Sequence, residues 1–193
     1  VPSWLPDLPE VRAEIAEYYQ SIARLDRGVG RLLDLIERSG SDRETVIIYL
    51  SDNGAAFPVA KTTLYDPGMR LPLIVSNAPR GATGVTCEAL VTWADLAPTV
   101  LDLAGAPQLA DHMFGESLTP LLAAPESPGR EYVFASHSFH QVTNYYPMRV
   151  VRSRRWKFIY NIAWKLDFPT ASDLHLSATW RSTVRESSDL GAR

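Results

Sequence analysis

The longest regular pattern in the sequence is a run of apolar residues spaced alternately by four and three positions. Its members are Val11, Ile15, Tyr18, Ile22, Leu25, Val29, Leu32 and Ile36. This spacing places all eight side chains on one side of a helix. Pro9 suits the first helical turn, and Gly40 suits a C-terminal stop. Such heptads also occur in coiled coils, but Gly28 and Gly30 inside the run favour a helix packed on a sheet.

Short apolar runs after this helix predict strands. Residues 45–50 (TVIIYL) are continuous and β-branched, which is typical of a strand buried on both faces and therefore of a parallel sheet. Residues 71–76 (LPLIVS) predict a second buried strand, and residues 85–92 a third, weaker one. Asp95 can cap a helix that runs to Leu103. Helices that alternate with apolar strands indicate an α/β fold.

The pattern changes after this second helix. Residues 106–130 are rich in Pro, Gly, Ala and polar residues, and strand-like segments follow at 132–136 and 148–162. We therefore predict a large α/β part over residues 1–128 and a smaller β-rich part over residues 129–193.

Composition narrows the class of protein. Of the 193 residues, 46% are hydrophobic and 21% are charged, which are ordinary globular values and exclude a disordered or collagen-like chain. The net charge of -3 argues against a nucleic-acid partner. No stretch approaches the roughly 18 consecutive apolar residues of a membrane span. The single cysteine, Cys87, excludes a disulfide within the chain, and we expect it to be a small core residue on the third predicted strand.

Candidate chemistry follows the first predicted strand, in the sequence Ser51-Asp52-Asn53-Gly54. In open α/β sheets the ligand site lies beyond the carboxyl ends of the strands. Asp52 and Asn53 offer hard oxygen donors there, which suit Ca²⁺ or Mg²⁺. The alternative is a plain turn, because these residue types are common in loops. Lys61, eight residues later, could direct its ammonium to a metal-bound anion, or could be an ordinary solvated lysine.

Four blocks of the sequence resemble, in the same order, the second half of the sulfatases, which are members of the alkaline phosphatase superfamily. The blocks are YYQSIARLDRGVGRLLDLIE, TVIIYLSDNG, KTTLYDPGMRLPLIV and VTWADLAPTVLDLAG. The later segment FASHSFHQVTNYYPMRVVRSRRWKFIYNIAWKLDFP is similar to the sulfamidases, the heparan N-sulfatase branch of that family. The resemblance implies an alkaline-phosphatase-like mixed sheet flanked by helices, followed by a smaller antiparallel β portion.

The resemblance also implies roles for particular residues. Asp52 and Asn53 would supply two ligands of a Ca²⁺ ion, with Mg²⁺ as the alternative. Lys61 would be catalytic and would contact the sulfate and the nucleophile, although sulfamidases have Arg at this position. The family's nucleophile is a formylglycine made from Cys or Ser in a C/S-x-P-S-R motif, and this chain contains no such motif. Cys87 is followed by neither Pro nor Arg. We therefore expect the nucleophile in a missing N-terminal half, and the remainder of the sulfatase domain as this chain's partner.

The histidines and the basic residues each allow two interpretations. His137 and His140 flank Phe139, and neutral imidazoles there could bind a sugar substrate or protonate a leaving amine. Ordinary loop histidines are the alternative. Five cations occur within nine residues, at Arg149, Arg152, Arg154, Arg155 and Lys157. Their alternation favours a solvated strand face over a glycan-binding stripe.

The function that we expect is metal-dependent hydrolysis of sulfate esters or sulfamates on a sulfated sugar, with the chain inactive by itself. The alternatives are a phosphodiester or phosphonate hydrolase of the same superfamily and a catalytically dead glycan-binding module. The start without Met, in a Pro-rich phrase, suggests a piece of a longer protein. The localisation stays unknown, and we favour a periplasmic or secreted protein over a cytoplasmic one.

Overall fold

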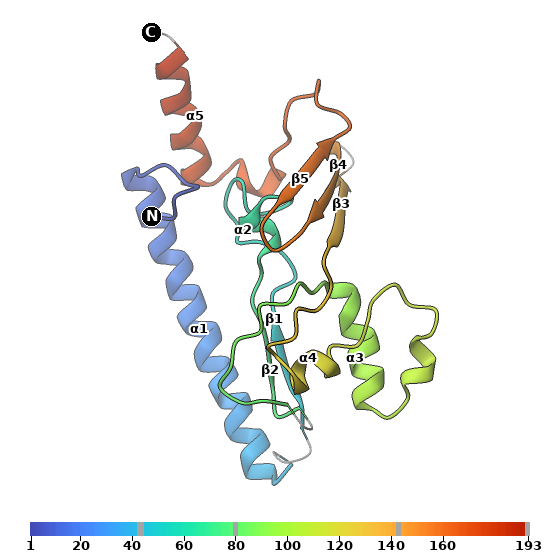
Figure 1. Cartoon of the computed structure of the whole chain (residues 1–193). Helices are drawn as coiled ribbons and strands as arrows, with labels where there is room; N and C mark the ends of the chain where they lie inside the picture. The colour runs from blue at the N-terminus through green and yellow to red at the C-terminus, as the bar shows by residue number, and fades with distance from the viewer. Residues whose placement is uncertain (42–44, 79–80, 142–143, 192–193) are drawn as a thin grey trace.

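A computed structural model of the chain describes residues 1–41, 45–78, 81–141 and 144–191. Its helices are α1 (Pro9–Ser39), α2 (Asp66–Met69), α3 (Leu96–Leu103), α4 (Thr119–Ala123) and α5 (Ala178–Gly191). Its strands are β1 (Ile47–Leu50), β2 (Leu73–Ser76), β3 (Val133–Phe139), β4 (Tyr145–Arg152) and β5 (Lys157–Asn161). Short 3-10 helices are η1 (Trp93–Asp95), η2 (Pro107–Ala110) and η3 (Ser172–Leu174). This mixture of helices and two small sheets confirms the α/β class (Figure 1).

Helix α1 forms as its apolar periodicity predicts. It begins at Pro9 and ends where Gly40 adopts a left-handed φ of 71°. Only its first turns are packed, since Val11 is fully buried against Leu5 and Phe57. Farther along, Leu25 and Leu32 are more than half exposed. The apolar stripe beyond Ile22 therefore has little cover within the described chain.

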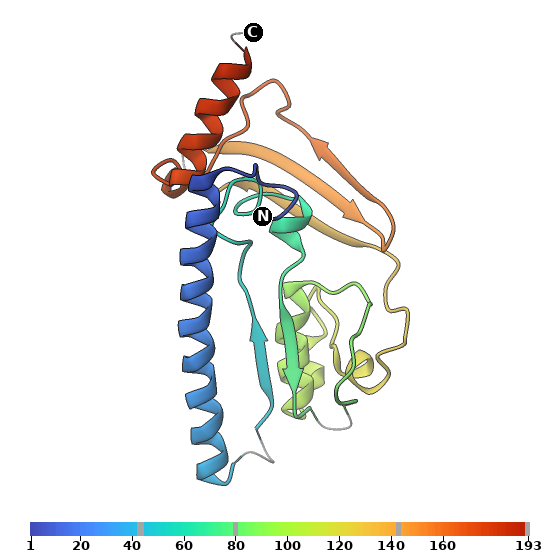
Figure 2. The same cartoon turned by 90° about the vertical axis from the view of Figure 1, so that its left-hand side faces the viewer.

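Strands β1 and β2 lie between α1 and α3, as both views of the chain show (Figures 1 and 2). They pair antiparallel, with Ile47 opposite Ser76 and Leu50 opposite Leu73. The prediction of a parallel sheet buried on both faces is therefore wrong for this pair: the β1 side chains are half-buried and Ile74 is 59% exposed. A continuous apolar run indicates a strand that tends to be buried, but it does not indicate whether the neighbouring strand runs parallel or antiparallel.

The third predicted strand, residues 85–92, does not form. Only Leu90 makes isolated bridges, to Gly129 and Arg130. Cys87 is exposed, so the expectation of a core cysteine is wrong. Short apolar segments form strands only when a partner strand pairs with them along their length, and neither described sheet includes this segment.

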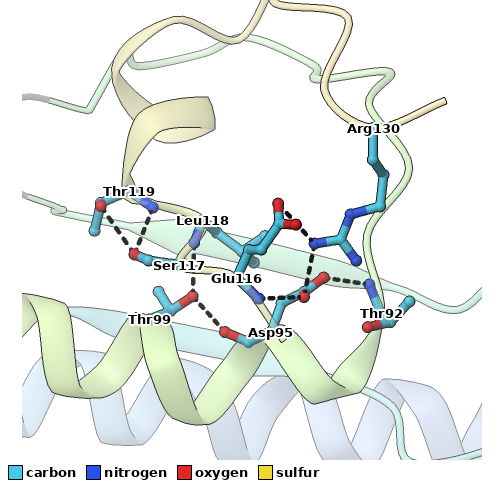
Figure 3. A network of polar contacts seen from close by, with 8 residues as sticks. All are labelled: Thr92, Asp95, Thr99, Glu116, Ser117, Leu118, Thr119 and Arg130. Carbon is cyan, nitrogen blue, oxygen red and sulfur yellow. Dashed lines mark hydrogen bonds and ion pairs between the residues drawn. The ribbon is translucent and has the colours of Figure 1, made fainter. Parts of the chain in front are cut away.

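Helix α3 is fixed by a buried polar network around Asp95 (Figure 3). The helical turns start at Thr92, and the Asp95 carboxylate accepts a hydrogen bond from the Thr92 amide at 2.7 Å, completing a capping box. Asp95 is the N-cap residue of α3, as predicted, but its side chain makes no capping bond to α3 and instead bonds the Thr92 end of η1. Asp95 also accepts bonds from the Glu116 amide and the Arg130 guanidinium, each at 2.9 Å. The network ties α3 to the chain that leads into α4 and β3.

Strands β3, β4 and β5 form an antiparallel sheet, which confirms the smaller antiparallel β portion. Its inner face carries Tyr146, Met148 and Val150, which pack with Leu64 into one core cluster. On the other face Phe134 and Phe158 are 72% and 64% exposed. The division into parts at residue 128 stays a prediction.

Helix α5 lies beside the start of α1 at the upper end of the molecule (Figures 1 and 2). The amides of Ala178 and Thr179 donate to the two carboxylate oxygens of Glu14, each at 2.9 Å. Arg185 adds an ion pair to Glu10 at 2.8 Å. None of the helices in the described part of the chain is long and apolar enough to cross a membrane.

Candidate active site

The Asp52-Asn53-Gly54 sequence forms a turn directly after β1. The Asp52 carboxylate accepts a hydrogen bond from the Asn53 amide at 2.9 Å, and the Asn53 side-chain amide donates to the Gly54 carbonyl at 2.8 Å. Both side chains are exposed. The turn therefore uses one Asp52 oxygen and the Asn53 amide nitrogen, which leaves the second Asp52 oxygen and the Asn53 amide oxygen as donors for a hard cation.

These donors suit Ca²⁺ or Mg²⁺ in kind but not in number. Ca²⁺ takes about six to eight oxygen ligands, and two side chains supply only a part of them. Within the described residues, no group of three or more His, Cys, Asp or Glu side chains could hold a metal ion. The metal roles of Asp52 and Asn53 stay predictions.

The loop that carries Lys61 has a strained and tightly packed backbone. Val59 and Thr62, on either side of Lys61, have φ values of 69° and 61°. β-Branched residues rarely adopt this left-handed conformation, and such strain gathers at functional sites. Ala60 is fully buried, and a Cβ added to Gly54 would come within 2.7 Å of its carbonyl oxygen. The turn that holds Asp52 and Asn53 is therefore in backbone contact with the residue before Lys61.

The Lys61 side chain reaches across the molecule to Asp173. Its ammonium donates a hydrogen bond to the Asp173 carboxylate, and the two groups form an ion pair. The hydrogen bond from Lys61 holds the pKa of Asp173 below its ordinary value, against the smaller opposing effect of burial. The Lys61 side chain is 19% exposed and that of Asp173 is 50% exposed, so the pair opens to solvent on the Asp173 side.

His140 is exposed and directly follows β3. The His137 ring, by contrast, is turned toward the interior. Its Nδ1 lies 3.3 Å from the Tyr146 carbonyl oxygen, and its Nε2 is buried without a hydrogen-bond partner among the described residues. The structure thus pairs Lys61 with Asp173, leaves His140 exposed and turns His137 toward the interior. The substrate-binding roles of His137 and His140 stay predictions.

The basic segment at Arg149 to Lys157 is only partly solvated. Arg152 and Lys157 both form ion pairs with Asp66, each at 2.5 Å, and their side chains are about four-fifths buried. The hydrogen bond from Lys157 lowers the pKa of Asp66, and the bond from Arg152 adds to this. The interpretation as a solvated strand face is therefore wrong for these two cations, which join the sheet to α2.

Asp173 is the residue of this site that the sequence analysis missed. It is 112 positions away from its partner Lys61, and neither periodicity nor a local motif marks it. Its neighbours give the only signal, because Ala171 and Leu174 are apolar and buried on both sides of it. A polar residue between two anchored apolar residues has a fixed direction, but its partner cannot be read from the sequence.

Comparisons with known proteins show which families the chain resembles. The family model described as Sulfatase matches residues 4–106, and the one described as N-sulphoglucosamine sulphohydrolase, C-terminal, matches residues 58–173. The chain is 37% identical to human N-sulphoglucosamine sulphohydrolase, over 95% of this chain and 38% of that protein. It is 28% identical to an ulvan-active sulfatase of Formosa agariphila, over 83% of this chain and 26% of that protein.

A solved structure of a 2-O GAG sulfatase shares the fold. It superposes with a TM-score of 0.62 at 23% identity, over 72% of this chain and 31% of that chain. The chain thus spans less than two fifths of the length of these relatives.

Proposed function

We propose, because this chain belongs to the sulfatase family, that the whole protein hydrolyses sulfate esters or sulfamates on sugars. One observation carries the proposal. A turn with two hard oxygen donors is in backbone contact with a strained loop whose lysine ammonium is held by an ion pair to Asp173. A cation site beside a fixed ammonium is what an anionic sulfuryl group requires.

The cofactor that we propose is Ca²⁺, or Mg²⁺ in its place. Asp52 and Asn53 would hold it with the oxygens that their own turn leaves free, and the rest of the protein would complete the ligand set. When bound, the cation neutralises negative charge that develops on the sulfuryl oxygens. The proposed nucleophile, a formylglycine, would belong to the rest of the sulfatase domain.

Lys61 contributes a second positive charge to the proposed site. An ammonium aimed at developing negative charge acts mainly in the transition state, because the sulfuryl oxygens carry more charge there than in the bound substrate. The buried loop holds the Lys61 backbone in place before substrate arrives. Lys61 would therefore bind and orient the sulfuryl group.

The substrate that we propose is a sulfated amino sugar of the N-sulfoglucosamine type. Support comes from the human relative, whose name states this substrate, and from the match of its C-terminal family model to residues 58–173. His140 is exposed after β3, where it could meet the sugar or its leaving amine. His137 would need to turn outward to do the same, because its Nε2 is buried.

The test uses the full-length protein and three substrates: an aryl sulfate, N-sulfoglucosamine and a bis-aryl phosphate. We expect sulfate release from the first two, loss of activity after removal of divalent cations with a chelator, and recovery with Ca²⁺. Preferred cleavage of the phosphate diester would instead indicate the phosphoryl-transfer alternative. Binding of a sulfated sugar without turnover would indicate a glycan-binding module.

A further inference from the structure

The position of the Lys61 ammonium depends on a second segment that is remote in sequence. The loop around Lys61 fixes its backbone, because a Cβ added to Gly68 would lie 2.5 Å from both the Ala60 and Thr63 carbonyl oxygens. The side chain beyond that backbone is a flexible four-carbon stem, and an ammonium has none of the planar geometry that pre-organises a guanidinium. Something other than the loop must therefore set where the charge lies.

Asp173 is held where it can set the position of the Lys61 ammonium. It lies in η3 between Ala171 and Leu174, which are 1% and 3% exposed. The approach to η3 is anchored as well, since the Phe168 ring lies 5.1 Å from that of Tyr146 and 6.3 Å from that of Tyr65, centroid to centroid. Tyr65 follows the Lys61 loop directly. The carboxylate is thus held on a rigid support that packs against the loop it serves.

The stability of the fold gives little reason for this ion pair. Asp173 is half exposed, and ion pairs open to solvent contribute almost nothing to folding. Burial of Ala171 and Leu174 already fixes η3 on the molecule. The pair must therefore be explained by what it does to Lys61.

We propose that Asp173 is a positioning residue, which holds the Lys61 ammonium at the point where it meets the sulfuryl group of the substrate. The inference rests on the proposed function. Asp173 acts through Lys61 and does not itself touch the reacting atoms.

The test is a double-mutant cycle in the full-length protein, with an aryl sulfate as substrate. Lys61→Ala lowers kcat strongly, and Asp173→Asn lowers kcat by about tenfold to a hundredfold with a smaller change in KM, because the charge is kept but misplaced. In the Lys61→Ala background, Asp173→Asn has almost no further effect, since it acts through the missing ammonium. Asp173→Glu keeps the pair and recovers part of the activity.

Asp7→Asn is the matched control, because it breaks another exposed carboxylate pair, to Arg12 at 2.6 Å, in the N-terminal segment. This control keeps wild-type kcat. Equal losses from Asp173→Asn with and without Lys61 would overturn the positioning role. So would an unchanged kcat in Asp173→Asn.

A second measurement does not depend on activity. Acetylation of lysines, followed by mass spectrometry, reports how well each ammonium is held, and Lys157 on Asp66 serves as the internal reference. Asp173→Asn should raise the labelling rate of Lys61 several-fold relative to Lys157. If the wild-type protein hydrolyses no sulfate, the proposed function fails, and the labelling alone decides whether Asp173 holds Lys61. An unchanged labelling rate would overturn the pair itself.

Discussion

At the scale of single residues, Asp52 and Asn53 show that a turn and a ligand site need not be alternatives. The sequence left both interpretations open, and the structure places the two side chains in a locally hydrogen-bonded turn with oxygens to spare. Residue types and spacing could predict these donors and the nearby lysine. They could not predict the role of Asp173, because Asp173 and its partner Lys61 are 112 positions apart in the sequence.

The first prediction concerns the metal. Asp52→Ala in the full-length protein removes one hard oxygen donor and should weaken Ca²⁺ binding by at least about tenfold. Calorimetric titration of the metal-free protein with Ca²⁺ measures the change. The control is Asp26→Ala on the exposed side of α1, which should bind Ca²⁺ like the wild type. Equal Ca²⁺ affinity in Asp52→Ala and the wild type would remove Asp52 from the ligand set.

A buried carboxylate gives the second prediction. Asp95 is fully buried and accepts bonds from Thr92, Glu116 and Arg130. Asp95→Ala leaves these donors without their acceptor and should lower the free energy of unfolding by roughly 3 kcal/mol or more. Urea denaturation of the full-length protein measures it, beside Asp111→Ala on the exposed surface near η2. Similar losses in both variants would mean that the network in Figure 3 adds no particular stability.

At the scale of elements, local pattern predicted those helices and strands whose apolar residues repeat regularly. Helix α1 and the strands β3 to β5 belong to this group. Helix α5 was missed, because its partners Glu14 and Glu10 lie more than 160 positions earlier in the chain. The parallel pairing of the first two strands was a wrong inference from burial alone. When a helix or strand is stabilised mainly by residues remote in sequence, its own residue pattern predicts it only weakly.

The third prediction tests the capping of α5 by α1. Burial raises the pKa of Glu14, but hydrogen bonds from Thr179 and Ala178 outweigh it and hold the pKa below the ordinary value. A lowered pKa in the folded state means that this contribution to stability is present near neutral pH and is lost as the pH falls through and below roughly 4. Glu14→Gln should cost about 1 kcal/mol at neutral pH.

The difference between Glu14→Gln and the wild type should shrink in acid, because the wild-type carboxylate then becomes protonated. Thermal unfolding of both full-length proteins at pH 7 and about pH 3 measures this. Glu17→Gln, at an exposed position one turn farther along α1, should match the wild type at both pH values. A constant difference across this range would contradict the ionic part of the cap.

At the scale of the whole molecule, apolar surface lies open on two sides. Leu25 and Leu32 on α1 are 52% and 60% exposed, and Phe134 and Phe158 lie uncovered on the sheet. The sequence predicted that Leu25 and Leu32 would pack on a sheet, but it could not say which part of the protein covers them. Exposed apolar patches of this kind mark surfaces that another part of a protein covers.

The fourth prediction concerns residues 1–193 expressed alone. They should release no sulfate from an aryl sulfate, with or without Ca²⁺, because this stretch contains no formylglycine motif. They should also associate with one another and bind a hydrophobic dye through their open apolar surfaces. Light scattering and dye fluorescence measure this. A monomer that unfolds cooperatively, or any measurable turnover, would contradict the prediction.

The contact between Glu14 and α5 also sets an order of events during synthesis on the ribosome. Glu14 is synthesised 164 residues before Ala178, whose amide donates a hydrogen bond to it. The Glu14 carboxylate therefore has no partner in α5 until nearly the whole stretch has been synthesised. Helix α1 can form early from local contacts, whereas the first turn of α5 gains its cap only after the intervening strands have brought the two ends together. Helix α5 is thus completed by a side chain of α1, and the closing of this loop joins the two ends of the described stretch.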